Sequence, residues 1–159
     1  MSRQKAIGTR FESGFVKYVS RKAKCGNIRR SALSGSRDVG DVHGLEIAGL
    51  NGIAELKNVK KLSPSLIDGF RYQTIVETLN AGADWGILVL HVAGCDQTGS
   101  SPSFGRNEVQ IRLRDLMLIE HELWLFDGGP TTDPYAYEDM WISMDVDTFL
   151  DFYNTEPEV

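Results

Sequence analysis

Cysteine and long apolar runs are both scarce in this sequence, and each absence excludes a class of protein. The 159 residues include 2 cysteines, Cys25 and Cys95, and neither these nor the 3 histidines have the spacing of zinc ligands. We therefore expect free thiols in a reducing compartment. No run approaches the about 18 apolar residues of a membrane-spanning helix, and no apolar segment follows the basic start as in a secretory signal. A cytoplasmic protein with no membrane partner is predicted.

Basic residues are scarce in the second half of the chain. Residues 62–159 contain 4 Lys and Arg against 17 Asp and Glu, a net charge of −13. Residues 1–61 contain 13 Lys and Arg against 5 Asp and Glu, a net charge of +8, so the halves together give the −5 of the whole chain. Because Lys and Arg bind phosphates by displacing counterions, the basic half is where we expect a nucleic acid to bind.

The order of the expected elements predicts one α/β domain over residues 1–159, with a mixed central β-sheet flanked by helices. In chain order these elements are a helix at 9–23, a strand within 28–33, a hairpin within 39–61, a helix at about 64–80, a strand at 84–92, a strand at 109–113, a helix at 115–123, a loop at 127–134, a strand at 140–146 and a helix from Asp147 to Tyr153. The crossover from 53–59 to 85–92 makes those two strands parallel.

Charged side chains gather in the hairpin segment Val39–Lys61. The Asn51-Gly52 pair predicts the turn. Side chains alternate along a strand, so Glu55 and Lys57 project from one face of it. Together with Asp41 they place two acids and an ammonium near one hairpin, which is an expensive arrangement without an ion to hold. The alternative for Glu55 and Lys57 is a surface salt bridge, which contributes under about 1 kcal/mol.

The first helix offers a further acid with two interpretations. Thr9 and Glu12 fit a capping box, in which Glu12 reaches back to the Thr9 amide. Glu12 is therefore either a helix cap or a ligand at the site near Asp41. The segment Cys25-Gly-Asn is expected to end this helix.

Asp41 followed by Glu55-Leu56-Lys57 resembles the active-site motif of the PD-(D/E)XK nuclease superfamily, an Asp, a hairpin turn and then Glu-X-Lys. Within that superfamily, residues of about 6–92 are most similar to Holliday-junction resolvases of the archaeal type and to related small phage nucleases. Those proteins carry a Glu on the first helix and then an Arg and a Ser ahead of the Asp. The residues in the corresponding places here are Glu12, Arg30 and Ser34 or Ser36.

The resemblance implies a restriction-endonuclease-like core and a structure-selective DNA endonuclease that depends on Mg²⁺, for which Mn²⁺ can substitute. The catalytic residues that it implies are Glu12, Asp41, Glu55 and Lys57. Asp41 and Glu55 would hold the metal with the Leu56 carbonyl, and Glu12 would ligate a second ion or a water. Lys57 would orient the attacking water or help to deprotonate it. Candidates for supporting hydrogen bonds are His43 and Gln73, although Gln73 also fits an exposed helix position.

The implied partner is branched DNA, in the first place a four-way junction, in a bacterial or phage-infected cell or at the nucleoid. The expected DNA-binding residues are Arg21, Lys22, Arg29, Arg30, Ser34, Ser36, Arg37, Lys60 and Lys61. A homodimer would present two sites to the junction. Apolar residues available for its interface, unless they belong to the core, are Phe70, Leu79, Trp85, Trp124 and Trp141.

Two other functions fit the same residues. One is a nuclease of the superfamily that acts on ordinary duplex, and the other is a catalytically silent module that binds DNA and a protein. The core is predicted at about 6–92. Residues 94–159 would hold an insertion together with the closing strand and helix, for which 108–126 and 140–153 are the candidates. Residues 94–107 are expected to form a long, mobile polar loop that either contacts DNA or is partly disordered.

Overall fold

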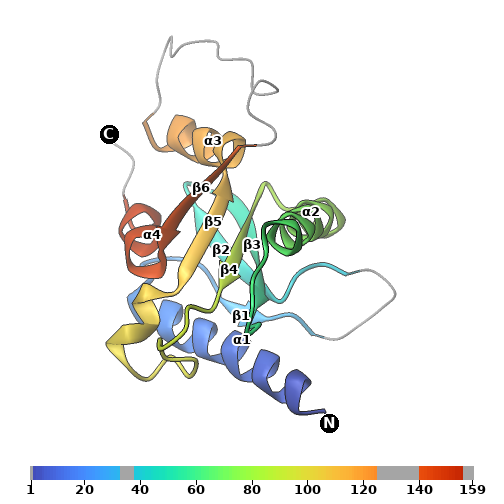
Figure 1. The fold of residues 1–159 in the computed structure, drawn as a ribbon. Coiled ribbons are helices and arrows are strands. Elements are labelled where there is room, and N and C mark those ends of the chain that lie inside the picture. The colour runs from blue at the N-terminus through green and yellow to red at the C-terminus, as the bar shows by residue number, and fades with distance from the viewer. Residues whose placement is uncertain (1, 33–37, 125–139, 156–159) are drawn as a thin grey trace.

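The computed structural model describes residues 2–32, 38–124 and 140–155, which form an α/β domain around a six-stranded mixed sheet (Figure 1). The strands lie side by side in chain order, and β3 pairs with β4 in parallel while the other pairs are antiparallel. The strands are β1 (Arg29–Arg30), β2 (Val42–Ile47), β3 (Leu50–Lys57), β4 (Trp85–Leu90), β5 (Glu108–Arg112) and β6 (Trp141–Asp145). The helices are α1 (Arg3–Lys22), α2 (Pro64–Ala81), the 3₁₀ helix η1 (Pro102–Arg106), α3 (Leu113–Trp124) and α4 (Val146–Tyr153). The predicted fold class is confirmed.

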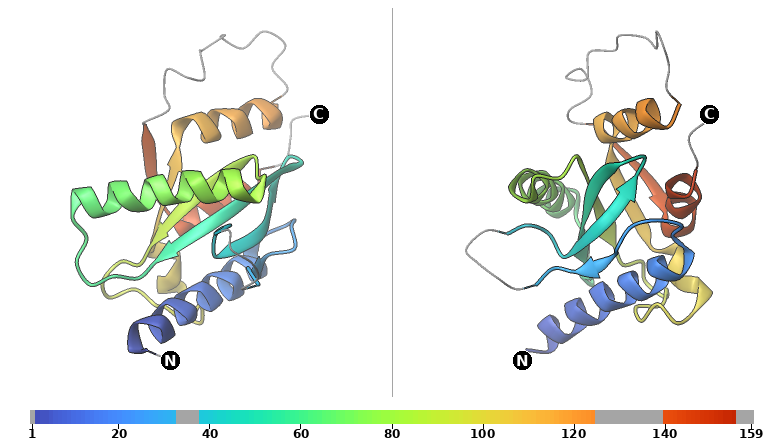
Figure 2. Two further views of the ribbon diagram at one scale, coloured as in Figure 1. Left: turned by 90° about the vertical axis from the view of Figure 1, so that its right-hand side faces the viewer. Right: turned by 180° about the vertical axis from the view of Figure 1, so that it is seen from behind.

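The helices divide between the two faces of the sheet. Figure 2 shows α2 on one side of the sheet and α4 on the other, with α1 running below. The apolar core lies on the side of α1 and α4, where Phe15 and Phe149 pack with the strand residues Leu56 and Val89. None of the helices in the described part of the chain combines the length and the apolar character needed to cross a membrane.

Local signals set the bounds of α2 close to the predicted 64–80. The Ser63 side chain caps its start by accepting a hydrogen bond from the Leu66 amide, and Pro64 occupies the first turn. Gly82 ends the helix in the left-handed conformation at φ 63°. The helix carries the chain from β3 across to β4, so the predicted parallel pair is confirmed.

The hairpin turn lies three residues before the predicted one. Ala48 and Gly49, at φ 49° and 80°, connect β2 to β3, whereas Asn51 and Gly52 lie inside β3. Positive φ at both central residues is the hairpin geometry that twists with the strands. Gly52 serves packing instead, because a Cβ there would lie 2.3 Å from the Trp85 ring.

Helix α1 begins at Arg3, so the predicted capping box is wrong. Ser2 is the cap, accepting a hydrogen bond from the Lys5 amide, and Thr9 lies inside the helix. Residues 3–6 are good helix formers, and the helix that they begin continues through Gly8 and Thr9. The helix also ends earlier than predicted, at Lys22 with an extended Ala23 after it.

The segment expected to be a mobile loop, 94–107, folds against α1. The carboxylate of Asp96 accepts hydrogen bonds from backbone amides within the segment, and η1 follows. Gly14 of α1 approaches this segment so closely that a Cβ would lie 2.3 Å from the Gln97 carbonyl oxygen. From the other side, a Cβ on Gly99 would lie 2.1 Å from the Gly14 carbonyl oxygen.

Both later candidate segments join the same sheet, since β5 pairs with β4 and β6 pairs with β5. Helix α4 is capped by Asp145, whose side chain accepts a hydrogen bond from the Thr148 amide. The predicted cap, Asp147, instead accepts a hydrogen bond from the Tyr18 hydroxyl and so joins α4 to α1. The loop predicted at 127–134 lies outside the described residues.

Candidate functional site

The pairing of β2 with β3 fixes the position of Asp41. The Asp41 amide donates to the Ala54 carbonyl at 3.0 Å, which extends the antiparallel ladder by one residue beyond β2. One carboxylate oxygen, Oδ2, accepts a hydrogen bond from the Leu56 amide at 2.9 Å. The Asp41 carboxylate is therefore held at the end of β3 by the strand on which Glu55 and Lys57 lie.

Strand alternation brings Glu55 and Lys57 together as predicted. Their Oε1 and Nζ atoms are 2.5 Å apart, and the Lys57 ammonium also lies over the Phe70 ring, 5.2 Å from its centroid. Leu56 points to the opposite face and belongs to the apolar core. The Glu55 side chain is only 3% exposed, so this is a buried ion pair and not the surface salt bridge considered as the alternative.

Helix α2 covers this pair with two polar side chains. The Gln73 amide nitrogen donates to Glu55 Oε1 at 3.0 Å and to Glu77 Oε1 at 2.7 Å. Of the two positions considered for Gln73, the structure has the one that supports Glu55 by a hydrogen bond. Glu77 is 1% exposed and was missed by sequence reasoning. The available signal was its spacing of four from Gln73, which puts both side chains on one face of the helix.

The acids of this cluster favour the protonated form. Burial raises the pKa of Asp41 to about 8, helped by the charge of Glu55 and opposed by the Leu56 amide. Burial also raises the pKa of Glu55 to about 8, helped by the neighbouring Glu77 carboxyl and opposed by Lys57. Glu77 has a raised pKa as well, again chiefly through burial. The buried Glu55 and Glu77 and the half-buried Asp41 therefore have too little positive charge around them to favour three carboxylates.

The pKa of Lys57 is raised like those of the acids, but for a lysine a raised pKa favours the charged form. Burial lowers its pKa, but the charges of Glu55 and Asp41 together with the hydrogen bond to Glu55 outweigh burial, so the pKa rises. Lys57 therefore stays protonated beside Glu55. Of the two roles considered from the sequence, this direction favours orienting a water over deprotonating it.

Glu12 lies at the rim of the cluster and pairs with Arg30. Its Oε2 accepts two hydrogen bonds from the Arg30 guanidinium, at 3.0 Å from Nε and 2.6 Å from Nη2. Its charge contributes to the raised pKa of Asp41, after burial and Glu55. With α1 beginning at Arg3, the capping role of Glu12 is excluded, and its position towards Asp41 remains.

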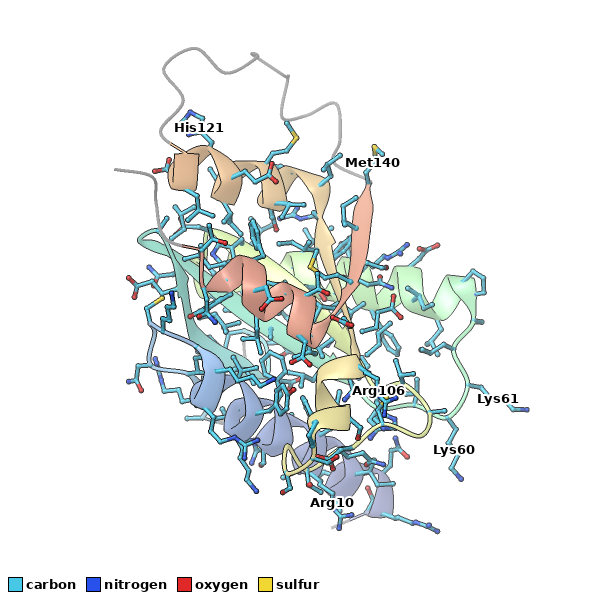
Figure 3. The ribbon with its side chains drawn as sticks, turned by 90° about the vertical axis from the view of Figure 1, so that its left-hand side faces the viewer. Arg10, Lys60, Lys61, Arg106, His121 and Met140 are labelled. Carbon is cyan, nitrogen blue, oxygen red and sulfur yellow. The ribbon has the colours of Figure 1, made fainter. Side chains whose placement is uncertain are left out.

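The predicted DNA-binding residues fall into three groups. Arg29 and Arg30 form the exposed strand β1, and Lys60 and Lys61 lie on the exposed connection from β3 to α2, where Figure 3 shows the two lysines pointing away from the molecule. Arg21 and Lys22 instead hold α1 to the rest of the fold, through the Gly99 carbonyl and an ion pair with Asp147. The remaining predictions, which lie outside the described residues, are Ser34, Ser36 and Arg37.

A polar cavity of about 350 Å³ opens beside the hairpin. Its lining includes Asn27, Arg29, His43 and Asn51, together with the end of α2 at Gly82. The Nε2 atom of His43 is buried and has no hydrogen-bond partner among the described residues. His43 therefore faces this cavity, and within the described structure its Nε2 supports neither Asp41 nor Glu55.

The donor set fits a magnesium site of the open kind. Within the described ranges, no group of three or more His, Cys, Asp or Glu side chains is gathered to hold a metal by itself. Asp41 and Glu55 provide two carboxylates, and Mg²⁺ characteristically takes one or two from a protein and keeps several waters. The sequence matches no family model, no curated protein and no solved structure. The resemblance to PD-(D/E)XK nucleases therefore rests on the residues of this chain alone.

Proposed function

We propose that the protein is a Mg²⁺-dependent DNA endonuclease of the PD-(D/E)XK type, with the four-way junction as its preferred substrate. The observation that carries this proposal is the convergence of the buried Glu55 with the half-buried Asp41 and Lys57 in one cluster at the end of β3. Buried acids with pKa values of about 8 are a costly feature, and a divalent cation offsets that cost.

The residues of the cluster have distinct roles in this proposal. Asp41 and Glu55 hold the ion, and Mn²⁺ can replace Mg²⁺ because both prefer oxygen ligands. When bound, the ion supplies a water of lowered pKa and neutralises charge on the scissile phosphate. Lys57, which stays protonated, orients a water or a phosphate oxygen with its ammonium. Gln73 holds the Glu55 carboxylate in place.

Glu12 and Arg30 act together at the rim. Two hydrogen bonds from Arg30 use one oxygen of Glu12, so Glu12 holds the guanidinium in a fixed orientation. An oriented guanidinium suits a phosphate oxygen better than a freely rotating one. We therefore assign to Glu12 the task of presenting Arg30 to DNA, in place of a second metal site.

A DNA substrate agrees with the distribution of basic groups. Arg29 and Arg30 lie on the exposed edge strand, and Lys60 and Lys61 lie three and four residues beyond Lys57. Phosphates on both sides of the cluster would meet these side chains.

A homodimer would cut the two strands of a junction symmetrically. The candidate interface changes, because Trp85 is fully buried in the core and is excluded. Leu79, which was among the predicted residues, is 73% exposed on α2 and stays a candidate, and Tyr72, which is 69% exposed, joins it.

The proposal is tested by incubating the protein with synthetic four-way, forked and linear DNA, with Mg²⁺ and with EDTA. We expect the four-way junction to be cut fastest with Mg²⁺ and left intact in EDTA, and Asp41→Asn to be inactive on all three. Equal cutting of linear DNA would assign the duplex nuclease instead. Binding without cutting under every condition would leave only the silent binding module.

A further inference from the structure

Glu77 is a buried acid to which the proposed function assigns no role. Its side chain is 1% exposed on the inner side of α2. Oε1 accepts a hydrogen bond from Gln73, but Oε2 is buried with no hydrogen-bond partner among the described residues. A buried carboxylate oxygen without a partner is destabilising, so it needs an explanation.

Gln73 places Glu77 next to Glu55. A side-chain amide nitrogen carries two protons, and both are used here, one on Glu55 Oε1 and the other on Glu77 Oε1. Two carboxylates therefore converge on one neutral donor. The ion pair that Glu55 makes is with Lys57, whose single ammonium must then balance the charges of Asp41, Glu55 and Glu77. When all three acids are ionised, the cluster carries a net charge of −2, which one divalent cation would balance.

The neighbours of Glu77 on the helix do not supply the missing partner. Thr74 and Thr78 flank it and are buried, yet their hydroxyls donate to carbonyls of α2 itself, those of Phe70 and Thr74. If Glu77 served only to anchor α2 to β3, its Oε1 would be sufficient, and a glutamine would anchor equally well without a charge. The orphaned Oε2 is the feature that anchoring leaves unexplained.

We propose that Glu77 is an outer carboxylate of the cation site, which holds a water of the ion bound by Asp41 and Glu55. This inference rests on the proposed function, since it requires that site. An outer position agrees with the described geometry, in which no three acids are gathered tightly enough to ligate one ion. It also suits a hard cation that keeps several of its waters. Helix α2 would then take part in binding the ion instead of merely covering the strand.

The test is Glu77→Gln, which keeps the shape of the side chain and the partner of Gln73. Titration calorimetry with Mn²⁺ alone, without DNA, should show affinity reduced about 10- to 100-fold, the usual effect of removing an outer-sphere partner. The melting temperature without metal should stay the same or rise, because a buried unpaired charge has been removed. Asp68→Asn is the matched control, since Asp68 is a 68% exposed acid on the same helix, and it should change neither measurement.

Each other outcome overturns a defined part of the proposal. If Glu77→Gln binds Mn²⁺ as tightly as the wild-type protein, Glu77 takes no part in the cation site and the inference is wrong, whatever the melting temperature. If Asp41→Asn abolishes Mn²⁺ binding while Glu77→Gln leaves it intact, the cation site stands and only Glu77 is removed from it. If the wild-type protein neither binds Mn²⁺ nor gains melting temperature from it, the cation site fails and the proposed function fails with it.

Discussion

The two faces of β3 differ more than any other adjoining regions of the molecule. Ala54 and Leu56 point into the apolar core that the strand shares with α1 and α4. Glu55 and Lys57 point to the opposite face, beneath α2. Neighbouring residues of one strand therefore serve different ends, because side-chain direction reverses at every step. One face stabilises the fold, and its stability permits the other face to bury charge.

The helices reflect the same division. Helix α1 presents Phe11, Phe15 and Val19 to the core, all fully buried. The buried residues of α2 are Thr74, Glu77 and Thr78, and its large apolar side chains at Tyr72 and Leu79 lie outside. Leu66 of the same helix is exposed as well. Helix α2 thus gains less from apolar burial than α1, and we expect it to open first when the protein unfolds locally.

The largest effects on activity and on stability are expected from two separate variants of β3, one on each face of the strand. Glu55→Gln should reduce cleavage more than about 100-fold, since removing even an outer-sphere partner of a metal reduces activity 10- to 100-fold. Leu56→Ala should lower the free energy of unfolding by about 2–4 kcal/mol, the effect of truncating a buried leucine. Activity assays and urea melts on both variants measure the two effects.

This pair is informative because each variant serves as the control for the other. Glu55→Gln should leave the folded structure intact, and Leu56→Ala should remain active at temperatures where it is folded. Equal reductions of activity in both variants would show that the two faces are not separable.

A smaller effect is expected in the pH dependence of stability. The pKa of Glu55 is raised to about 8 in the folded protein, well above the ordinary range of an unfolded glutamate. Between about pH 5 and pH 8 the folded protein therefore holds a proton that the unfolded chain releases, so stability falls as pH rises, by up to about 1.4 kcal/mol per pH unit. Thermal melts in EDTA from pH 5 to 8 should show this decline, to which Asp41 adds because its pKa is also about 8. Glu55→Gln should therefore reduce the slope of the decline without abolishing it.

Asp96 gives a control of opposite sign. Burial raises its pKa, but hydrogen bonds from Ser101, Thr98 and Ser100 outweigh burial and lower the pKa to about 2. Its contribution to stability is present above about pH 4 and disappears as pH falls towards 2. Asp96→Asn should therefore leave the decline between pH 5 and 8 unchanged. An unchanged slope in Glu55→Gln would contradict the assignment of part of this decline to Glu55.

The smallest expected effect concerns salt and DNA. Exchanging both Lys60 and Lys61 for Gln should reduce the slope of log K against log salt by roughly 1.8, about 0.9 for each phosphate that a lysine no longer neutralises. Exchanging Arg21 and Lys22 should leave the slope unchanged and lower the melting temperature, because these two hold α1 to the fold. Fluorescence anisotropy with a labelled junction at several salt concentrations measures the slope. If exchanging Arg21 and Lys22 reduced the salt slope more than exchanging Lys60 and Lys61 did, the DNA would lie along α1 and not beside Lys60 and Lys61.

Local chemistry made part of the fold predictable. Ser63, Pro64 and Gly82 bound α2 through contacts within a few residues, and the sequence located that helix to within one residue. The turn was misplaced because two glycines, Gly49 and Gly52, compete for it. The choice depends on Trp85, which packs over Gly52 from a strand 33 residues further along the chain. A contact between residues so far apart in the sequence cannot be predicted from the hairpin segment alone.

The candidate site divides in the same way. The proximity of Glu55 and Lys57 follows from strand alternation alone, and Asp41 follows from the pairing of adjacent strands. Glu77 could not be found in this way, because its position depends on which side of α2 rests on the sheet. The buried residues of that side are Thr74, Glu77 and Thr78, so no apolar stripe marks it in the sequence.

The close approach of Gly14 to residues 97–99 also limits where residues can be inserted in α1. Each added residue in a helix turns the following side chains by about 100° and advances them by about 1.5 Å. An insertion between Glu12 and Gly14 would therefore either drive a side chain into the backbone of residues 97–99 or swing Glu12 away from Arg30. The contact between Gly14 and Gly99 therefore fixes the position of α1 along its axis, and with it the position of Glu12. Natural or engineered variants should tolerate changes of length before Gly8 far better than after Glu12.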